Sequence, residues 1–200
     1  MFFIFLFSFY HNVFTLYFSL NFLINDNEII FKIKVTINNP INNKLFSYTM
    51  DKQGKKQGYY RCWQMCVLIT EVFYKNDLAE GLAQEWDRHG VLRAKCFYEL
   101  GKKQGLYIEY HANGTMCEVT PYVDGVIEGK VEVYDIDGSI LSSTEYRGGY
   151  KNGIMIMYWQ NGNKRLQRFY YMNRLHGICD MYDINGNLTH QEQYYLGDIK

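Results

Sequence analysis

A glycine recurs at an almost constant interval through the last three quarters of the chain, and this period constrains the fold more than any other feature. The steps between successive glycines are 23, 24, 24, 24 and 24 residues. The glycines are Gly58, Gly81, Gly105, Gly129, Gly153 and Gly177. An aromatic residue follows each by five positions: Trp63, Trp86, Tyr110, Tyr134, Tyr158 and Tyr182. Six units of this length are typical of a repeat array, in which a recurring column of residues is structural.

The columns predict β-hairpins. Residues alternate toward the aromatic column, as in the stretch from Leu106 to Tyr110, and a period of two predicts a strand. Nine positions after the anchoring glycine a second glycine follows a polar residue, as in Asn113-Gly114, and this pair predicts a two-residue type I′ hairpin turn. Glycine, asparagine or aspartate stands four positions before each anchor, which predicts a left-handed turn between hairpins. The predicted strands are 59–65, 68–75, 82–87, 92–99, 106–111, 116–123, 130–135, 140–147, 154–159, 164–171, 178–183 and 188–194.

The full pattern is Tyr-x-x-Gly-x-x-x-Gly-x-x-x-x-Tyr-x-x-Asn-Gly, and residues 98–114 and 146–162 carry it most completely. It resembles the MORN repeat, in the variant found in bacterial and large-virus arrays, over residues 51–200. The predicted fold is therefore all-β: an elongated single-layer antiparallel meander of about six stacked hairpins. We expect the tyrosine and tryptophan columns to form its core, because large rings bury much apolar area. The first unit departs from the pattern and lacks the turn glycine expected after Cys66, as terminal repeats often do.

The first fifty residues do not follow the repeat. Residues 1–25 carry no charged side chain and are long enough to cross a membrane as a helix. Three interpretations stay open: a membrane anchor from Met1 to Ile24, a cleavable signal peptide, or a start codon assigned too early, with translation beginning at Met50. The predicted domains are a hydrophobic segment at 1–25, a polar linker at 26–50 with one strand near 29–37, and the repeat array at 51–200. An anchor followed by Lys32, Lys34 and Lys44 would leave the repeats in the cytoplasm.

Charge argues against a nucleic-acid partner. The chain has 21 basic and 21 acidic residues, and three basic and two acidic residues precede Asp51. The array therefore carries 18 basic and 19 acidic residues, whereas phosphate-binding domains are usually strongly basic. One basic cluster stands out as a candidate partner patch, with solvated strand faces as the alternative interpretation: Lys164, Arg165, Arg168 and Arg174.

The sequence predicts no catalytic, cofactor or metal site. The five cysteines include no Cys-x-x-Cys pair and are odd in number, so free thiols in a reducing compartment are expected. Three histidines fall in columns that are otherwise polar: His89 in the turn column, His111 with the aspartates, and His176 before an anchoring glycine. No serine or cysteine has both a base and an orienting partner.

The sequence leaves two classes of function to weigh, an enzyme and a non-enzymatic binding scaffold. An enzyme would need a cluster of polar residues that break the columns, and none is found outside the first unit. The preferred prediction is a non-enzymatic repeat scaffold that binds a protein partner, with a membrane tether at its N-terminus. The alternatives, implied by the family resemblance, are a phospholipid-binding module and an antitoxin-like protein that neutralises a partner.

Overall fold

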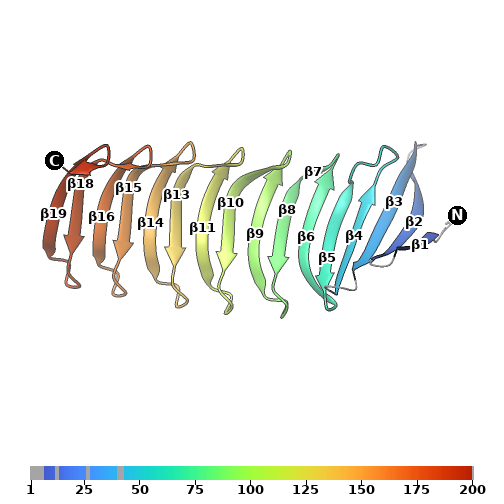
Figure 1. Ribbon diagram of the computed structural model, residues 1–200, viewed down its shortest axis with the longest axis horizontal. Helices are drawn as coiled ribbons and strands as arrows, with labels where there is room; N and C mark the ends of the chain where they lie inside the picture. Colours follow the sequence, from blue (N-terminus) through green and yellow to red (C-terminus); the bar gives the residue numbers. More distant parts are fainter. Residues whose placement is uncertain (1–6, 12–13, 26–27, 40–42, 200) are drawn as a thin grey trace. The chain divides into compact units, whose positions relative to one another are not determined.

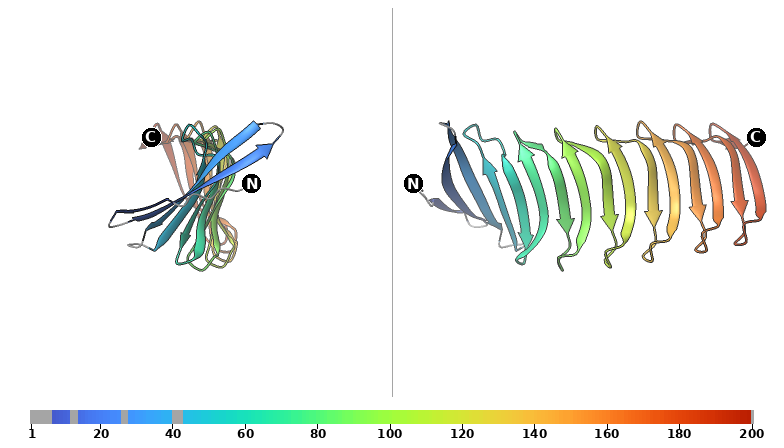
Figure 2. Two further views of the ribbon diagram at one scale, coloured as in Figure 1. Left: turned by 90° about the vertical axis from the view of Figure 1, so that its right-hand side faces the viewer. Right: turned by 180° about the vertical axis from the view of Figure 1, so that it is seen from behind.

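The computed structural model describes residues 7–11, 14–25, 28–39 and 43–199, with side chains from Val35 onward. Every regular element in these ranges is a β-strand, and the strand pairs within each unit are antiparallel (Figure 1). Contacts divide the chain into two compact units, Met1–Lys102 and Lys103–Lys200. Within each unit the strands form a single layer with short turns at both ends, which Figure 2 shows from behind. The predicted all-β, single-layer antiparallel meander is confirmed in each unit.

The described residues of the first unit form nine strands. They are β1 (Phe7–His11), β2 (Phe14–Asn25), β3 (Glu28–Asn39), β4 (Lys44–Met50), β5 (Gly58–Gln64), β6 (Val67–Lys75), β7 (Leu78–Ala79), β8 (Gly81–Trp86) and β9 (Leu92–Glu99). Each longer strand pairs with the next along the chain, and β6 also pairs with β8 beyond the short β7.

The N-terminal segment is not helical where the structure describes it, so the interpretation of this segment as a membrane-spanning helix is not supported. Residues 7–11 and 14–25 are strands β1 and β2. The physical reason is a period of two within β2, where Leu16, Phe18 and Leu20 alternate with polar residues. The register sets these three residues opposite Ile37, Val35 and Ile33 of β3. Strands β3 and β4 occupy most of the segment expected to be a linker, and β4 was not foreseen. No helix of the described residues is long and apolar enough to cross a membrane.

The second unit contains eleven strands, of which β10 begins at the last residue of the first unit. They are β10 (Lys102–Tyr110), β11 (Met116–Val123), β12 (Val126–Ile127), β13 (Gly129–Tyr134), β14 (Ile140–Arg147), β15 (Tyr150–Tyr158), β16 (Lys164–Tyr171), β17 (Arg174–Leu175), β18 (Gly177–Tyr182), β19 (Leu188–Tyr195) and β20 (Asp198–Ile199). The twelve predicted strands agree with the structure to within one residue at every boundary, except that β10 and β15 begin four residues earlier.

The turn at the Asn-Gly pairs differs from the prediction, whereas the predicted left-handed turn between hairpins is present. Asn113 has no positive φ, and only Gly114, with φ of 87°, is left-handed. Five residues separate Tyr110 from its partner Met116, so the loop is too long for a two-residue turn; His111 O accepts the Gly114 N–H at 3.0 Å. The type I′ assignment at the Asn-Gly pairs is therefore wrong. Pairs of residues with positive φ lie instead between hairpins, as at Asp124 (51°) and Gly125 (82°).

The atypical first repeat has a shorter turn at its hairpin tip than the other repeats. Gln64 pairs directly with Val67, so Met65 and Cys66 form a two-residue turn at the tip of hairpin β5–β6. Both have positive φ, 48° and 67°. The residue that is missing from this repeat is thus absorbed by a tighter loop, and the strands on either side keep their pairing.

Hairpins of the second unit alternate in form, so that the structural repeat is two hairpins, or 48 residues. Strands β10 and β15 run unbroken through their anchoring glycines, whereas the intervening hairpins begin with the split pairs β12–β13 and β17–β18. The residue two positions before the anchor alternates in step: Lys103, Ile127, Lys151 and Leu175. Both lysines lie over tyrosine rings, with Lys103 Nζ 4.9 Å from the centre of Tyr122 and Lys151 Nζ 5.4 Å from that of Tyr170.

Candidate binding surface

The two faces of the second unit differ in chemistry. One face, here called the tyrosine face, carries Tyr122, Tyr146, Tyr170 and Tyr194. The other, here called the apolar face, carries Leu106, Val123, Ile154, Phe169, Tyr171 and Ile178. The register places each set together, because Ile154 pairs with Phe169 while Gly153 pairs with Tyr170 one step away. The strand alternation that predicted the hairpins therefore also separates two surfaces.

The aromatic columns lie on opposite faces, rather than in one stack as the sequence suggested. Tyr134 donates to Glu132 two residues earlier at 2.7 Å, which places its column on the apolar face with Lys130 and Glu132. Tyr194 donates in the same way to Glu192, a residue of the tyrosine face. All of these tyrosines are half-buried. The most buried side chains are smaller ones, and four of the five in this unit lie on the tyrosine face: Thr120, Thr144, Leu166 and Cys179.

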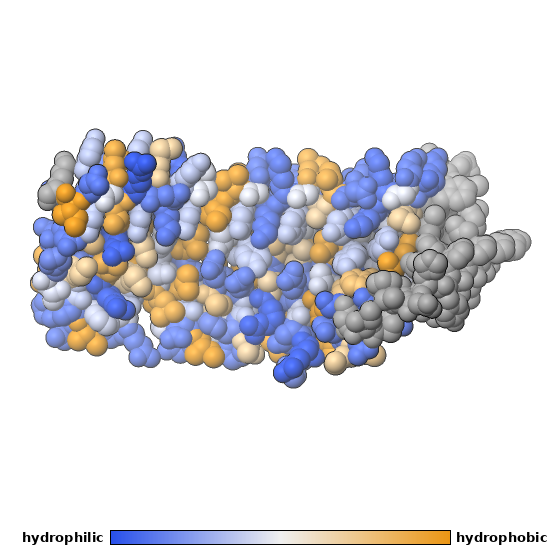
Figure 3. Space-filling model, viewed as in Figure 1, coloured by the Kyte–Doolittle hydropathy of each residue, from blue (hydrophilic) through white to orange (hydrophobic). Residues whose placement is uncertain are grey.

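Exposed apolar residues gather on the apolar face. Leu106 is 53% exposed, Ile178 51% and Phe169 40%. On the tyrosine face of the described second unit, only Ile199 of the last strand is a comparably exposed large apolar residue. Figure 3 shows one side of the molecule, on which hydrophobic groups are divided by hydrophilic residues. A face with this many exposed apolar side chains is typical of an interaction surface.

Hairpin β13–β14 interrupts the apolar face with charges. Lys130 Nζ lies 2.7 Å from Glu132 Oε1, and Glu145 stands opposite Lys130 in the register. The Lys130 ammonium and the Tyr134 hydroxyl together hold the pKa of Glu132 below its usual range. The hydrogen bond to Glu132, with some burial, raises the pKa of Tyr134 to about 12. A hollow of about 510 Å³ is lined by this hairpin and by Asn152: Glu128, Gly129, Lys130, Glu145, Tyr146 and Arg147.

The structure divides the predicted basic patch. Lys164, Arg165 and Arg168 lie on β16, but Arg168 belongs to the tyrosine face with Leu166 and Tyr170. The Arg165 guanidinium lies 4.9 Å from the centre of the Trp159 ring at the hairpin tip. Arg174 lies beyond the far end of β16, and the seven steps from Lys164 to Tyr171 alone span about 23 Å. The four side chains do not form one patch.

The repeat columns occupy fixed places in the strands. The anchoring glycines open β5, β8, β13 and β18 or lie inside β10 and β15, and all six have positive φ. The aromatic residue five positions later closes β8, β10, β13, β15 and β18, and Trp63 stands one residue before the end of β5. A Cβ at Gly153 would collide with the Glu145 side chain, so at this position the lack of a side chain is required by space as well as by conformation.

Hairpin tips of the second unit are joined in pairs. The His111 Nε2–H donates to Tyr134 O of the next hairpin at 3.0 Å, and Asn113 Nδ2 donates to Ile136 O at 2.9 Å. Two hairpins later, Trp159 Nε1 and Asn161 Nδ2 make the same bonds, to Tyr182 O and Ile184 O. In the hairpins between, the position of His111 is taken by aspartate, which accepts N–H groups of its own turn.

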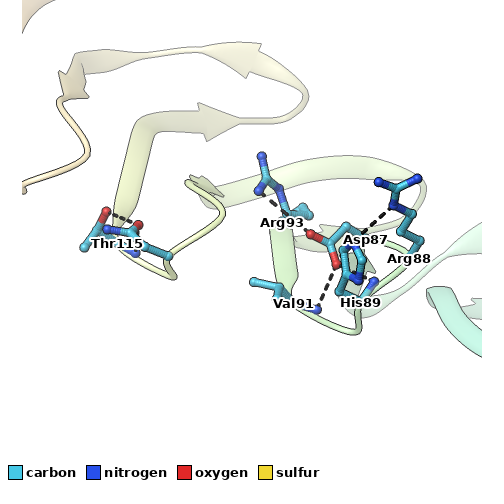
Figure 4. A network of polar contacts seen from close by, with 7 residues as sticks. Asp87, Arg88, His89, Val91, Arg93 and Thr115 are labelled. Atoms are coloured by element: carbon cyan, nitrogen blue, oxygen red, sulfur yellow. Dashed lines mark hydrogen bonds and ion pairs between the residues drawn. The ribbon is translucent and has the colours of Figure 1, made fainter.

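The first unit shows such an aspartate in detail. Asp87 Oδ1 accepts the backbone N–H groups of His89, at 2.8 Å, and Val91, at 3.1 Å, while Arg93 lies 4.0 Å from the other carboxylate oxygen (Figure 4). Partial desolvation opposes the shift, but these bonds outweigh it and lower the pKa of Asp87. His89 is thus a turn residue, as the column comparison predicted.

Cysteines and histidines form no site within the described residues. All five cysteines are free, and no group of three metal-ligating side chains is present. His176 lies among aromatic rings, with its ring centre 5.3 Å from that of Tyr195 and 6.0 Å from that of Tyr171, and its buried Nδ1 has no hydrogen-bond partner. No nucleophile or second base accompanies it.

Comparison with known families identifies the repeat. The model of the family described as MORN repeat variant matches residues 103–124, which span β10 and β11 up to the following turn. The other hairpins keep the same glycine and aromatic columns. The chain thus contains a MORN repeat at residues 103–124. Comparison with curated proteins gave no match.

The alternation of lysine with an apolar residue two positions before the anchoring glycine was not predicted, because each column was taken as uniform. Comparing every second unit would have revealed it, together with the alternation of a ring and an aspartate at the tip.

Proposed function

We propose that the chain is a non-enzymatic scaffold whose repeats bind a protein partner through the apolar face of the second unit. The supporting observation is the one-sided exposure of large apolar residues, from Leu106 to Ile178. Burial of such residues is the main favourable term in protein association. The free cysteines support a reducing, cytoplasmic location for the repeats.

This scaffold function does not depend on a membrane tether at the N-terminus. Residues 7–11 and 14–25 are strands, so the helical anchor loses its support. Phospholipid binding and antitoxin-like neutralisation are retained as outcomes of the test.

The test compares two isoleucines of one hairpin. Ile178 of the apolar face is 51% exposed, and Ile184 at the hairpin tip is 54% exposed. Full-length tagged protein should capture a defined partner from extracts of its own cells, as measured by quantitative mass spectrometry. Ile178→Glu should reduce this capture at least tenfold, whereas Ile184→Glu should leave it unchanged.

Two results would contradict the proposal. One is equal capture by both variants. The other is binding to vesicles of phosphatidylcholine and phosphatidylserine with no captured protein, which would favour the phospholipid-binding alternative. Loss of growth inhibition on coexpression with a captured toxin would identify the antitoxin-like form of partner binding.

A further inference from the structure

The charged hairpin on the apolar face has a symmetric pattern. Along β13 and the residue before it, the side chains read negative, positive, negative: Glu128, Lys130 and Glu132. Along β14, starting from the same end of the hairpin, the side chains are positive, negative and neutral: Arg147, Glu145 and Ser143. Lys130 pairs with Glu145 and Glu132 with Ser143, so the two series stand side by side. Lys130 thus lies beside the oppositely charged Glu145, whereas Glu132 lies beside the neutral Ser143.

The flanking hairpins are apolar on both sides of this centre. Leu106 pairs with Pro121 in hairpin β10–β11, and Ile154 pairs with Phe169 in hairpin β15–β16. Leu106, Ile154 and Phe169 are exposed. The face therefore reads apolar, charged, apolar across three neighbouring hairpins, with its centre between β13 and β14.

We propose that the partner of this face is a second copy of the chain, packed face to face about a two-fold axis that runs along the strands between β13 and β14. This rotation exchanges the positions of the two strands. Lys130 then meets the partner's Glu145, and Arg147 meets the partner's Glu128. Hairpin β10–β11 packs on the partner's β15–β16, which places apolar residues against apolar residues. The same patch serves both copies, as an isologous interface requires.

The dimensions suit a reversible dimer. Three hairpins present six strands about 4.8 Å apart and about 20 Å long, or roughly 600 Å² of sheet face per copy. Specific interfaces bury about 800 Å² per partner, so this one lies near the lower limit. Two sheets can stack about 10 Å apart with their strands about 30° from parallel, a geometry that twisted sheets adopt readily. We expect association that depends on protein concentration and weakens with salt.

An unrelated partner is the competing occupant, and charge complementarity favours the second copy. An unrelated protein would need its own matching arrangement of four charges, whereas the two-fold axis supplies that arrangement from the chain itself. This inference rests on the proposed function, because it names the partner of the same face.

The test is the mass of full-length protein in solution, measured by sedimentation over a range of concentrations and salt. Wild-type protein should approach twice the 23.8 kDa of one chain. Lys130→Glu and Glu145→Lys should each raise the dissociation constant at least tenfold, because like charges then meet across the interface. Lys164→Glu makes the same change of charge at a hairpin tip of the same unit and should leave the dissociation constant unaltered.

Mixing the two single variants gives the sharpest result. A Lys130→Glu copy carries glutamate at both positions and a Glu145→Lys copy carries lysine at both, so each should be monomeric alone and the mixture should form a heterodimer. If Lys130 interacted only with Glu145 of its own chain, mixing the two variants would not restore association. Glu145 also accepts the Ile154 N–H at 2.9 Å, so its folding must be checked by circular dichroism. Arg147→Glu carries no such bond and should weaken the dimer as Lys130→Glu does.

The outcomes separate the two proposals. Wild-type protein that is monomeric at all concentrations, or a mixture of single variants that stays monomeric, overturns the dimer. If the monomer still captures another protein in a way that depends on Ile178, the proposed function stands with a different partner. Self-association that persists in Lys130→Glu and Arg147→Glu also overturns the arrangement.

Discussion

Gly114 shows how a single residue fixes a hairpin tip. Its φ is 87°, and a Cβ added there would meet no atom within 4 Å, so the requirement for glycine is conformational and not steric. Gly114→Val should lower the free energy of unfolding by about 1–3 kcal/mol, because a β-branched residue is strained at positive φ. Denaturant unfolding measures this change in the free energy of unfolding. Ala112→Val, in the same loop but without a positive φ, should cost much less, and equal losses would contradict this explanation.

The Tyr134 hydroxyl makes stability depend on pH at the alkaline end. Its pKa is raised to about 12 by Glu132, whereas an unfolded tyrosine titrates near 10. The folded chain therefore holds this proton more tightly, and the contribution is present below about pH 10 and lost as pH rises toward 12. Tyr134→Phe should flatten this part of the stability curve and remove a phenol that ionises near pH 12 in an ultraviolet titration. An unchanged titration would show that another tyrosine is responsible.

Hydrogen bonds join the tips of neighbouring hairpins, and a substitution that replaces a single side-chain nitrogen can test one of them. Asn113→Asp keeps the side-chain oxygen that accepts the Thr115 N–H but removes the Nδ2 donor to Ile136 O. We expect a loss of about 1 kcal/mol in the free energy of unfolding, the usual value for one hydrogen bond. Asn185→Asp is the matched control in the same column, because the Asn185 side chain makes no bond to another hairpin. Similar losses in both variants would mean that the added charge, rather than the lost donor, is responsible.

Sequence alone gave the strands of the array but not their surfaces. Alternation around Leu106 and Ile154 located the ends of β10 and β15 to within one residue but missed the first four residues of each strand. The N-terminal segment was misread because its composition was weighed before its alternation at Leu16, Phe18 and Leu20. The basic cluster from Lys164 to Arg174 looked continuous along the chain, yet neighbours in a strand point to opposite faces. Whether Lys130 and Glu145 lie side by side on one face depends on the pairing register of β13 and β14. A column of equivalent residues in successive repeats does not give that register.

At the scale of the whole molecule, the two-hairpin repeat predicts which deletions are tolerated. Removing residues 129–176 leaves His111 beside a hairpin with aspartate at its tip, Asp183, and keeps the alternation of Lys103 with an apolar residue. Removing 129–152 instead places His111 beside Trp159 and loses Lys151 from its tyrosine. The 24-residue deletion should therefore lower the free energy of unfolding more, per hairpin removed, than the 48-residue deletion, as measured by urea unfolding. In a linear array with neighbour-only contacts, equal losses per hairpin would show that all interfaces are alike.

The pairing of tips by His111 and Trp159 has a consequence for how such a gene can lengthen. A duplication that copies one hairpin would set two tips of the same kind side by side, so that the alternation of a ring with an aspartate would be lost. A duplication that copies two hairpins preserves every bond at the new junction. Selection acting on the stability of this chain would thus retain copies added in pairs and discard single ones, and the repeat inherited through its history would be twice as long as the one that its glycines display.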